Sequence, residues 1–225
     1  PKIRNEPIVK LKCLISAANS MGSIAVSDIT GLVLAGGRAQ RMGGIDKGLI
    51  PFKGLPLIES ALERLKPQVN TILINANRNH SIYSSYGYPV LADEDDSFSG
   101  PLAGFVAGLK ACKTPYLMTV PCDSPLFPLD LAKQLAITLE AEQSKIGYAS
   151  SKDMAGKVWA QPVFCLMRRD LLDSLTSFLA SGERKIDRWF AQENAASTLF
   201  ADDVVFANAN TPEELAQLES FTHSH

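Results

Sequence analysis

Short apolar blocks alternate with longer amphipathic segments along the chain from Thr30 onward. Most of the short blocks are continuous apolar runs, which are typical of strands buried on both faces of a parallel sheet. Strands that alternate with helices predict an α/β fold: a single Rossmann-like domain with a mostly parallel sheet flanked by helices. The expected strands are residues 31–35, 71–76, 88–92, 115–120, 145–150, 162–167 and 203–208.

Apolar residues recur at helical spacing between several of these blocks. Residues 57–65 and the leucines that follow Pro128 predict helices docked on the sheet, and the small-residue-rich segment 101–112 predicts a helix that packs closely. We expect a last helix to start at Thr211, because Pro212 suits the first helical position and Glu214 completes a capping box.

Composition narrows the possible classes of protein. The chain has 225 residues, of which 46% are hydrophobic, enough for one compact domain with a real core. Its formal charge of −2 gives no general attraction to nucleic acid or to an anionic membrane. Four scattered cysteines and three histidines predict neither a zinc site nor a disulfide framework, so we expect inert thiols and a cytoplasmic location.

The first 28 residues are expected to lie outside the domain. The apolar stretch 8–18 is too short to span a bilayer and is interrupted by Lys10 and Lys12, which also makes it a poor signal peptide. Met21 followed by Gly22 resembles a second start, so we expect residues 1–20 to be an added or extended sequence. The expected division is an N-terminal extension without regular structure at 1–28 and a single α/β domain at 29–225.

The segment 29–49, ITGLVLAGGRAQRMGGIDKGL, carries the clearest chemical signal. An expected buried strand runs directly into a glycine-rich loop with Arg38, Arg41 and Lys47, and such a loop can bring backbone amides and positive charge to a phosphate. The segment is neither a Walker loop nor a GxGxxG fingerprint. The alternative is a glycine-rich strand-to-helix turn with solvated basic residues.

This segment resembles the signature of nucleotidyltransferases with the glycosyltransferase-A-like fold, in which LAGG, RMG and a DK pair bind the nucleoside triphosphate. The spelling LAGGxxxRMGGxDKG resembles the molybdenum cofactor guanylyltransferases in particular. The resemblance covers the chain from Ile29 to about Glu219, and four later segments support it in order. These are NANR at 75–78, GPLAG at 100–104, PCDSP at 121–125 and NANTPEEL at 208–215.

The resemblance implies transfer of GMP from GTP to the terminal phosphate of molybdenum-molybdopterin, with Mg²⁺ and release of pyrophosphate. The product would be molybdopterin guanine dinucleotide, and its lability implies transient contact with recipient molybdoenzymes. Two enzymatic alternatives are a cytidylyltransferase that acts on the same cofactor and a sugar-phosphate nucleotidyltransferase. A third alternative is a catalytically silent nucleotide-binding module.

The resemblance also implies roles for residues of the first half of the chain. The backbone of Leu34, Ala35 and Gly36, followed by Gly37, would meet the guanine base, and Lys47 with Arg41 would meet the triphosphate. Asp123, at the end of a strand, would hold Mg²⁺, although a helix N-cap is the alternative. Asn75, Asp93 and Gly100 would approach the nucleotide, whereas turn formation is the alternative for the first two.

Residues of the second half are assigned to the pterin acceptor. Asn208 and Asn210 resemble the family's asparagines beside the pterin pocket. Arg184 and Lys185 match only a short basic motif, and they could bind the pterin phosphate or belong to a solvated helix start. Donor and acceptor would then meet between the two halves of the chain.

Overall fold

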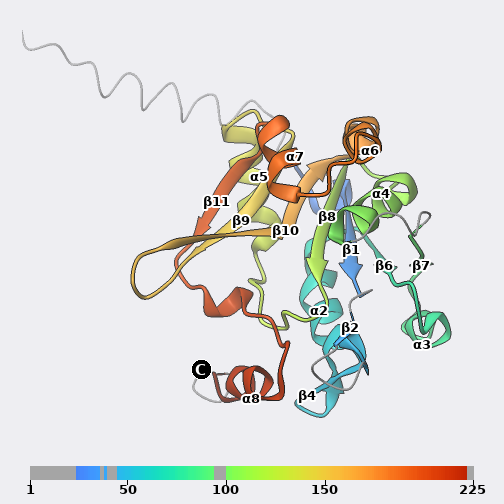
Figure 1. Ribbon diagram of the computed structural model, residues 1–225, viewed down its shortest axis with the longest axis vertical. Helices are drawn as coiled ribbons and strands as arrows, with labels where there is room; N and C mark the ends of the chain where they lie inside the picture. The colour runs from blue at the N-terminus through green and yellow to red at the C-terminus, as the bar shows by residue number, and fades with distance from the viewer. Residues whose placement is uncertain (1–23, 36–37, 40–44, 94–99, 222–225) are drawn as a thin grey trace, which may run out of the picture.

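We describe a computed structural model of the chain for residues 24–35, 38–39, 45–93 and 100–221. Its centre is a seven-stranded sheet of order β11-β9-β10-β8-β1-β6-β7, with helices on both faces (Figure 1). The sheet strands are β1 (Ile29–Leu34), β6 (Thr71–Asn75), β7 (Val90–Leu91), β8 (Tyr116–Pro121), β9 (Ile146–Lys152), β10 (Val158–Arg168) and β11 (Ala196–Phe200). The predicted α/β class with a mostly parallel sheet is confirmed.

Parallel pairing brings the carboxyl ends of the central strands to one edge of the sheet. β1 pairs in parallel with both β6 and β8, and β6 pairs in parallel with β7. β10 is the exception, since it runs antiparallel to β8 and to β9, whereas β11 is parallel to β9. One continuous sheet therefore joins strands from both halves of the chain.

The helices cover the two faces with two separate apolar clusters. Side chains alternate along β1, so Val33 packs with α2 and α5, while Leu32 packs with α4, α6 and α7. Four of the helices fall where the sequence predicts them. The helices are α2 (Leu57–Leu65), α3 (His80–Ser84), α4 (Pro101–Ala111), α5 (Leu131–Ala141), α6 (Leu172–Ala180), α7 (Ile186–Gln192) and α8 (Pro212–Phe221).

A third, smaller apolar cluster ties α8 to the segment after the glycine-rich loop. Leu218 of α8 packs with Ile50, Phe52 and Leu57, and the Lys53 amide donates to the Glu219 carboxylate at 2.7 Å. The short elements here are β2 (Arg38–Ala39), β3 (Ile45–Asp46), η3 (Lys47–Leu49), β4 (Pro51–Phe52) and β5 (Leu55–Pro56). The remaining 3₁₀ turns are η1 (Val26–Asp28), η4 (Lys66–Gln68), η5 (Arg169–Leu171) and η6 (Val204–Phe206).

The prediction of a strand at 203–208 is wrong. Residues 204–206 form the turn η6, and the edge strand of the sheet is β11 instead. Phe206 is buried because its ring packs edge-on against Phe164 at 4.9 Å and Phe200 at 5.1 Å between centroids. The apolar run therefore contributes a side chain to the core and does not pair in the sheet.

The predicted start of the last helix is confirmed. The Glu214 amide donates to Thr211 Oγ1 at 3.2 Å, as in a capping box. The Glu214 carboxylate instead accepts from the amide of Asn210 at 2.8 Å, one residue earlier than in the standard box. This contact also fixes the backbone of Asn210.

Within the described residues, no helix is long and apolar enough to cross a membrane.

Candidate active site

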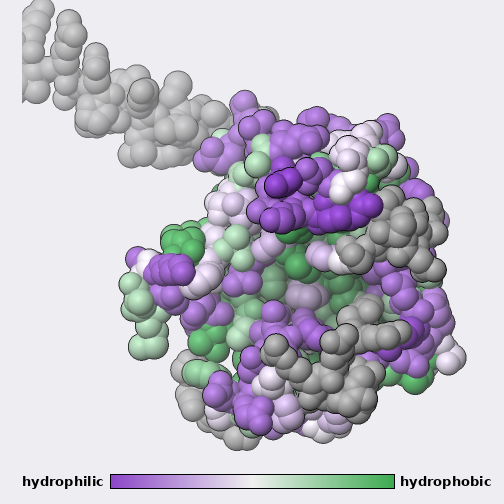
Figure 2. All heavy atoms as spheres, viewed as in Figure 1, coloured by the Kyte–Doolittle hydropathy of each residue, from purple (hydrophilic) through white to green (hydrophobic). Residues whose placement is uncertain are grey.

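The carboxyl ends of β1, β6 and β8 lie side by side. Leu34, at the end of β1, is in register with Asn75 on one neighbour and with Pro121 on the other. The loops that follow these strands therefore start from one edge, where open α/β sheets bind their ligands. On the side of the sheet that carries α4 and α7, the surface is hollowed over this part of the molecule, and apolar residues lie at the base of the hollow (Figure 2).

Lys47 lies at the centre of this edge. Its ammonium group donates to Asp123 Oδ2 at 2.8 Å and to Asn210 Oδ1 at 2.5 Å. Both charged side chains are largely buried, with exposed fractions of 22% for Lys47 and 12% for Asp123. One positive charge thus joins segments that are 76 and 163 residues away in the chain.

The segment 208–210 is attached to the end of β8 by more than this lysine. The Ala209 amide donates to the Asp123 carbonyl at 2.8 Å, and the Ser124 hydroxyl donates to Asn208 Oδ1 at 2.5 Å. Asn208 and Asn210 are therefore brought to Asp123 and Lys47, while their role toward an acceptor stays a prediction. The N-cap alternative for Asp123 is wrong, since Asp130 occupies the N-cap of α5.

Asn75 and Asp93 are also brought together. Asn75 Nδ2 donates to Asp93 Oδ1 at 2.9 Å, and Asn77 Nδ2 donates to Asp93 Oδ2 at 2.7 Å. The Asp93 amide returns a hydrogen bond to Asn77 Oδ1 at 2.8 Å. Both oxygens of this carboxylate are thus oriented by amides. Sequence reasoning missed Asn77, although its place two residues after Asn75 in NANR was a usable signal.

Helix α4 approaches Asn75 so closely that only glycine fits at position 104. A Cβ there would lie 2.5 Å from Asn75 Oδ1 and 2.5 Å from a methyl carbon of Leu34. Gly100 has a different reason to be glycine, because its φ is 95° at the N-cap of α4. Pro101 starts the helix, as the sequence predicts. A nucleotide contact of Gly100 stays a prediction.

The backbone proposed to read the base is partly engaged within the sheet. The Leu34 carbonyl accepts from the Cys122 amide at 3.1 Å, and the Ala35 amide donates to the Asn75 carbonyl at 2.8 Å. Any base contact of this strand end must use the other backbone groups. Gly36, Gly37 and Arg41 lie outside the described residues, so their roles stay predictions.

Asp46, the residue before Lys47, forms a second polar cluster. It is only 4% exposed, accepts from Asn79 Nδ2 at 3.0 Å and pairs with Arg78 at 3.8 Å. The hydroxyl of Tyr83 is buried beside it, and burial, followed by the neighbouring Cys122 and Asp46, raises the pKa of Tyr83. The sequence placed Asp46 only within the DK pair of the triphosphate-binding signature, and it gave Asn79 and Tyr83 no role.

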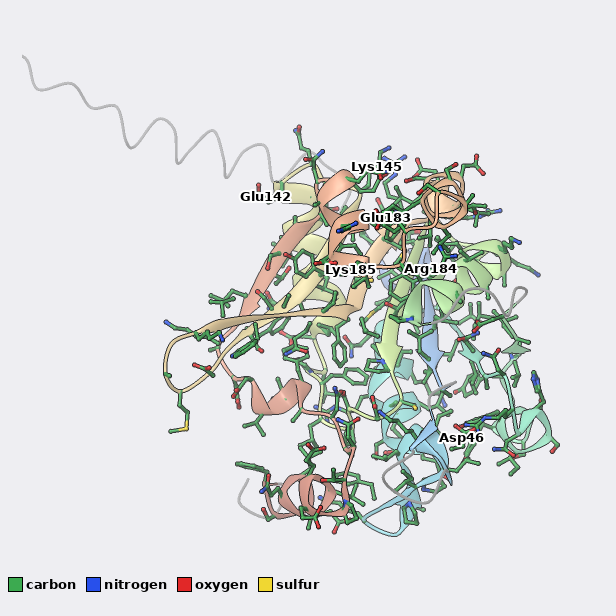
Figure 3. The ribbon with its side chains drawn as sticks, in the orientation of Figure 1. Asp46, Glu142, Lys145, Glu183, Arg184 and Lys185 are labelled. Atoms are coloured by element: carbon green, nitrogen blue, oxygen red, sulfur yellow. The ribbon has the colours of Figure 1, made fainter. Side chains whose placement is uncertain are left out.

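Arg184 and Lys185 lie elsewhere in the molecule. Figure 3 shows both near α6 and α7, well separated from Asp46, which lies at the far end of β1. Arg184 Nη1 donates to the carbonyls of Leu179 and Glu183, both at 2.7 Å, so its guanidinium caps the end of α6. Lys185 is the N-cap residue of α7. A role in pterin binding stays a prediction for both.

The described cysteines are free and buried, and the pKa directions agree with inert thiols. Burial, and then the charge of Asp123, raises the pKa of Cys122 well above its ordinary value. Burial raises the pKa of Cys165 to about 12. Thiolate formation is therefore strongly disfavoured at Cys122 and Cys165 near neutral pH.

No cluster of three or more His, Cys, Asp or Glu side chains suited to a metal occurs among the described residues. Mg²⁺ does not need one, because it commonly binds one or two carboxylates together with waters and substrate phosphates. Both oxygens of Asp93 are engaged by asparagines, whereas Asp123 pairs, among the described side chains, with Lys47, which a phosphate could draw away. Asp123 therefore fits a magnesium ligand better than Asp93.

The order and directions of the strands are those of the glycosyltransferase-A-like fold of nucleotidyltransferases. Two solved structures share this fold at a TM-score of 0.70. One is molybdopterin-guanine dinucleotide biosynthesis protein A from Archaeoglobus fulgidus, 20% identical, covering 87% of this chain and 100% of that one. The other is CMP:2-keto-3-deoxy-manno-octonic acid synthetase with CTP, 12% identical, with coverages of 88% and 99%.

Sequence comparison then identifies the family. The MobA-like NTP transferase domain matches residues 31–198. The chain is 64% identical over 197 residues to the molybdenum cofactor guanylyltransferase of Polynucleobacter asymbioticus, covering 88% of this chain and 98% of that protein. It is 54% identical over 194 residues to the Bordetella pertussis enzyme of the same name, with coverages of 86% and 98%. The chain belongs to the molybdenum cofactor guanylyltransferase family.

Proposed function

We propose that this chain transfers GMP from GTP to the terminal phosphate of molybdenum-molybdopterin, releasing pyrophosphate. The oxygen of the acceptor phosphate forms a bond to the α-phosphorus of GTP, and the bond from that phosphorus to the bridging oxygen of pyrophosphate breaks. Relatives that are 64% and 54% identical carry the name of this activity. The product is molybdopterin guanine dinucleotide.

The contact of Lys47 with both Asp123 and Asn210 is the observation that carries the proposal. Lys47 follows the glycine-rich loop of the donor motif, whereas Asn210 belongs to the segment expected to hold the acceptor. A phosphoryl-type transfer needs its two substrates aligned and its developing charge neutralised at one point. The ammonium of Lys47 has the position and the charge for that task.

A strong general base is not required for this reaction. The attacking phosphate is already ionised at neutral pH, so the protein contributes alignment and positive charge. When the triphosphate binds, Lys47 exchanges Asp123 for phosphate oxygens, and the freed carboxylate of Asp123 becomes available to a cation. Mg²⁺, when bound, would neutralise triphosphate charge. Arg41 is proposed as a further positive contact to the triphosphate.

The acceptor is proposed to lie against the segment 208–210. Asn208 and Asn210 offer amide groups suited to the edge of a pterin, and both are held in place by contacts with residues 124 and 47. Arg184 and Lys185 are proposed to meet the phosphate or the far end of the acceptor. Both lie near α6 and α7, well separated from Asp46 (Figure 3).

The decisive experiment measures pyrophosphate release from each of the four nucleoside triphosphates, with and without molybdopterin and with Mg²⁺ or EDTA. We expect release from GTP that depends on both molybdopterin and Mg²⁺. Release with CTP instead would indicate a cytidylyltransferase. Binding of GTP without turnover would indicate a silent nucleotide-binding module, and turnover with a sugar phosphate in place of molybdopterin would indicate a different acceptor class.

A further inference from the structure

The cluster around Asp46 brings several buried polar atoms together. Among the described residues, Asp46 Oδ1, Arg78 Nη2 and Tyr83 Oη are all buried without a hydrogen-bond partner in the usual geometry. The carboxylate accepts a hydrogen bond from Asn79, forms an ion pair with Arg78 that is too long for a hydrogen bond, and interacts with the Tyr83 hydroxyl, whose pKa it helps to raise. Burial of a carboxylate costs free energy of folding unless hydrogen bonds and charges offset its lost hydration. The position of Asp46 therefore suggests a role other than stabilising the fold.

The cluster anchors the chain immediately before Lys47. Asp46 pairs through its backbone with β2, while its side chain reaches inward to the connection between β6 and α3. Asn79 is held for this contact by a left-handed backbone with φ of 52°, which asparagine tolerates better than most residues. The side chain of Lys47 contacts Asp123 and Asn210, so the adjacent residues 46 and 47 are tied to different segments.

A second anchor follows Lys47 directly. A Cβ at Gly48 would lie 2.7 Å from Tyr83 Oη and 3.4 Å from Cys122 Sγ, so the backbone of residue 48 lies directly against α3 and the end of β8. The Ile50 amide then donates to the Lys47 carbonyl at 3.2 Å. The backbone of Lys47 is therefore fixed on both sides.

We propose that Asp46 is a positioning residue for Lys47: its buried carboxylate, held by Asn79 and Arg78, sets the place from which the lysine reaches the reacting phosphates. This inference rests on the proposed function and adds a residue that touches neither substrate. Its effect passes through Lys47 alone. Loss of the anchor should therefore lower kcat, because the charge is misplaced in the transition state, more than it raises the KM for GTP.

Asp46→Asn keeps the shape of the side chain and removes its charge. We expect kcat to fall on the order of tenfold to a hundredfold, since a displacement of about 1 Å can cost a hundredfold, while the KM for GTP changes little. A purely structural role would instead lower the melting temperature and leave kcat of the folded enzyme at the wild-type value. That result would overturn the proposal.

A double-mutant cycle tests whether Asp46 acts through Lys47. In the Lys47→Ala background, Asp46→Asn should cause no further loss of rate, because the group that it positions is gone. If the two losses multiply instead, Asp46 acts independently and the proposal is wrong. Failure of the proposed function is distinguishable, since the wild-type enzyme itself would then release no pyrophosphate from GTP.

A milder variant covers the case in which Asp46→Asn does not fold. Asn79→Gly removes the amide that holds Asp46 but permits the same positive φ, and it should reproduce a smaller loss of kcat. Asn194→Gly is its matched control, because Asn194 also has a φ of 52° and follows α7, away from the site. Equal kcat for the two glycine variants would overturn the proposal.

Discussion

Lys47 and Arg184 are both basic residues assigned to phosphate binding by the sequence, yet the fold uses them differently. Lys47 donates to side chains from two distant segments, one of them a carboxylate that a bound triphosphate could replace. Arg184 donates to two main-chain carbonyls, that of Leu179 near the end of α6 and that of Glu183, the residue before it. A sequence motif predicts the residue type and its charge. Whether that charged group can bind a ligand depends on the contacts that it makes in the folded protein.

Because Lys47 has the contacts expected of a ligand-binding charge and Arg184 does not, we expect the largest loss of activity on substitution of Lys47. Lys47→Ala should lower the rate of GMP transfer on the order of a hundredfold or more, because one preorganised charge contact to the transition state is lost. Steady-state pyrophosphate release measures this change. Lys133→Ala, which removes an exposed lysine of α5, is the control and should retain wild-type rates. Wild-type turnover by Lys47→Ala would remove the central element of the proposed site.

Asp123 is expected to show the next largest effect. Asp123→Asn should lose most activity, roughly a hundredfold, and should need more Mg²⁺ for what remains, because a neutral amide is a poorer magnesium ligand. A magnesium titration of the rate measures both quantities. Asp170→Asn, which removes the exposed partner of Arg168, is the matched control. An unchanged magnesium requirement would move the metal to Asp93.

The tight contact at Gly48 offers a rescue experiment. Gly48→Ala should lower kcat roughly tenfold, because its new methyl group would meet the Tyr83 hydroxyl and displace the backbone beside Lys47. Tyr83→Phe removes that hydroxyl, which has no hydrogen-bond partner among the described residues. The double variant should therefore regain rate. A double variant no faster than Gly48→Ala would show that the contact with Tyr83 is not what fixes this backbone.

The smallest effects are expected at Arg184 and Lys185. Changing both to Ala should raise the apparent KM for molybdopterin roughly tenfold, the value of one charged hydrogen bond, with GTP affinity nearly unaltered. The single variants separate two roles of Arg184. Arg184→Ala should also lower the free energy of unfolding by about 1 kcal/mol, because it loses the hydrogen bond to the Leu179 carbonyl of α6, whereas Lys185→Ala should not.

A titration with the opposite outcome would change the division of the chain. If the double variant lost GTP binding and kept molybdopterin binding, the segment would belong to the donor site. If only the stability of Arg184→Ala changed, both residues would be structural. With either outcome, Arg184 and Lys185 would lose their proposed role in binding the acceptor phosphate, and the phosphate-binding role of Lys47 would be unaffected.

The fold was predictable because its strands and helices obey the expected periodicities. The run GLVL and the helix at 57–65 need no tertiary information to be recognised. The edge strand β11 was missed because Ser197 and Thr198 give it a polar sequence. That polarity is explained by its neighbour, since the Ser197 hydroxyl donates to Ser150 Oγ at 2.8 Å.

The site was predictable only in part. Parallel strands end at one edge, so a meeting of Asn75 with Asp93 follows from their positions in the sequence. The attachment of residues 208–210 to Asp123 depends on how the chain returns after β11, which no local pattern encodes. The anchor at Asp46 was missed for the same reason, because Asn79 and Arg78, which hold its carboxylate, lie on the separate connection between β6 and α3.

The docking of α8 has a consequence for the order in which the site is completed during synthesis. The loop with Lys47 emerges early from the ribosome, yet its partner Asn210 and the supporting Leu218 come more than 160 residues later. Synthesis proceeds from the N-terminus, and domains generally fold as units. A nascent chain in which β1, β6 and β8 have been translated still lacks half of the junction at Lys47, so the junction is completed only when the segment 208–218 has been translated and has reached the loop.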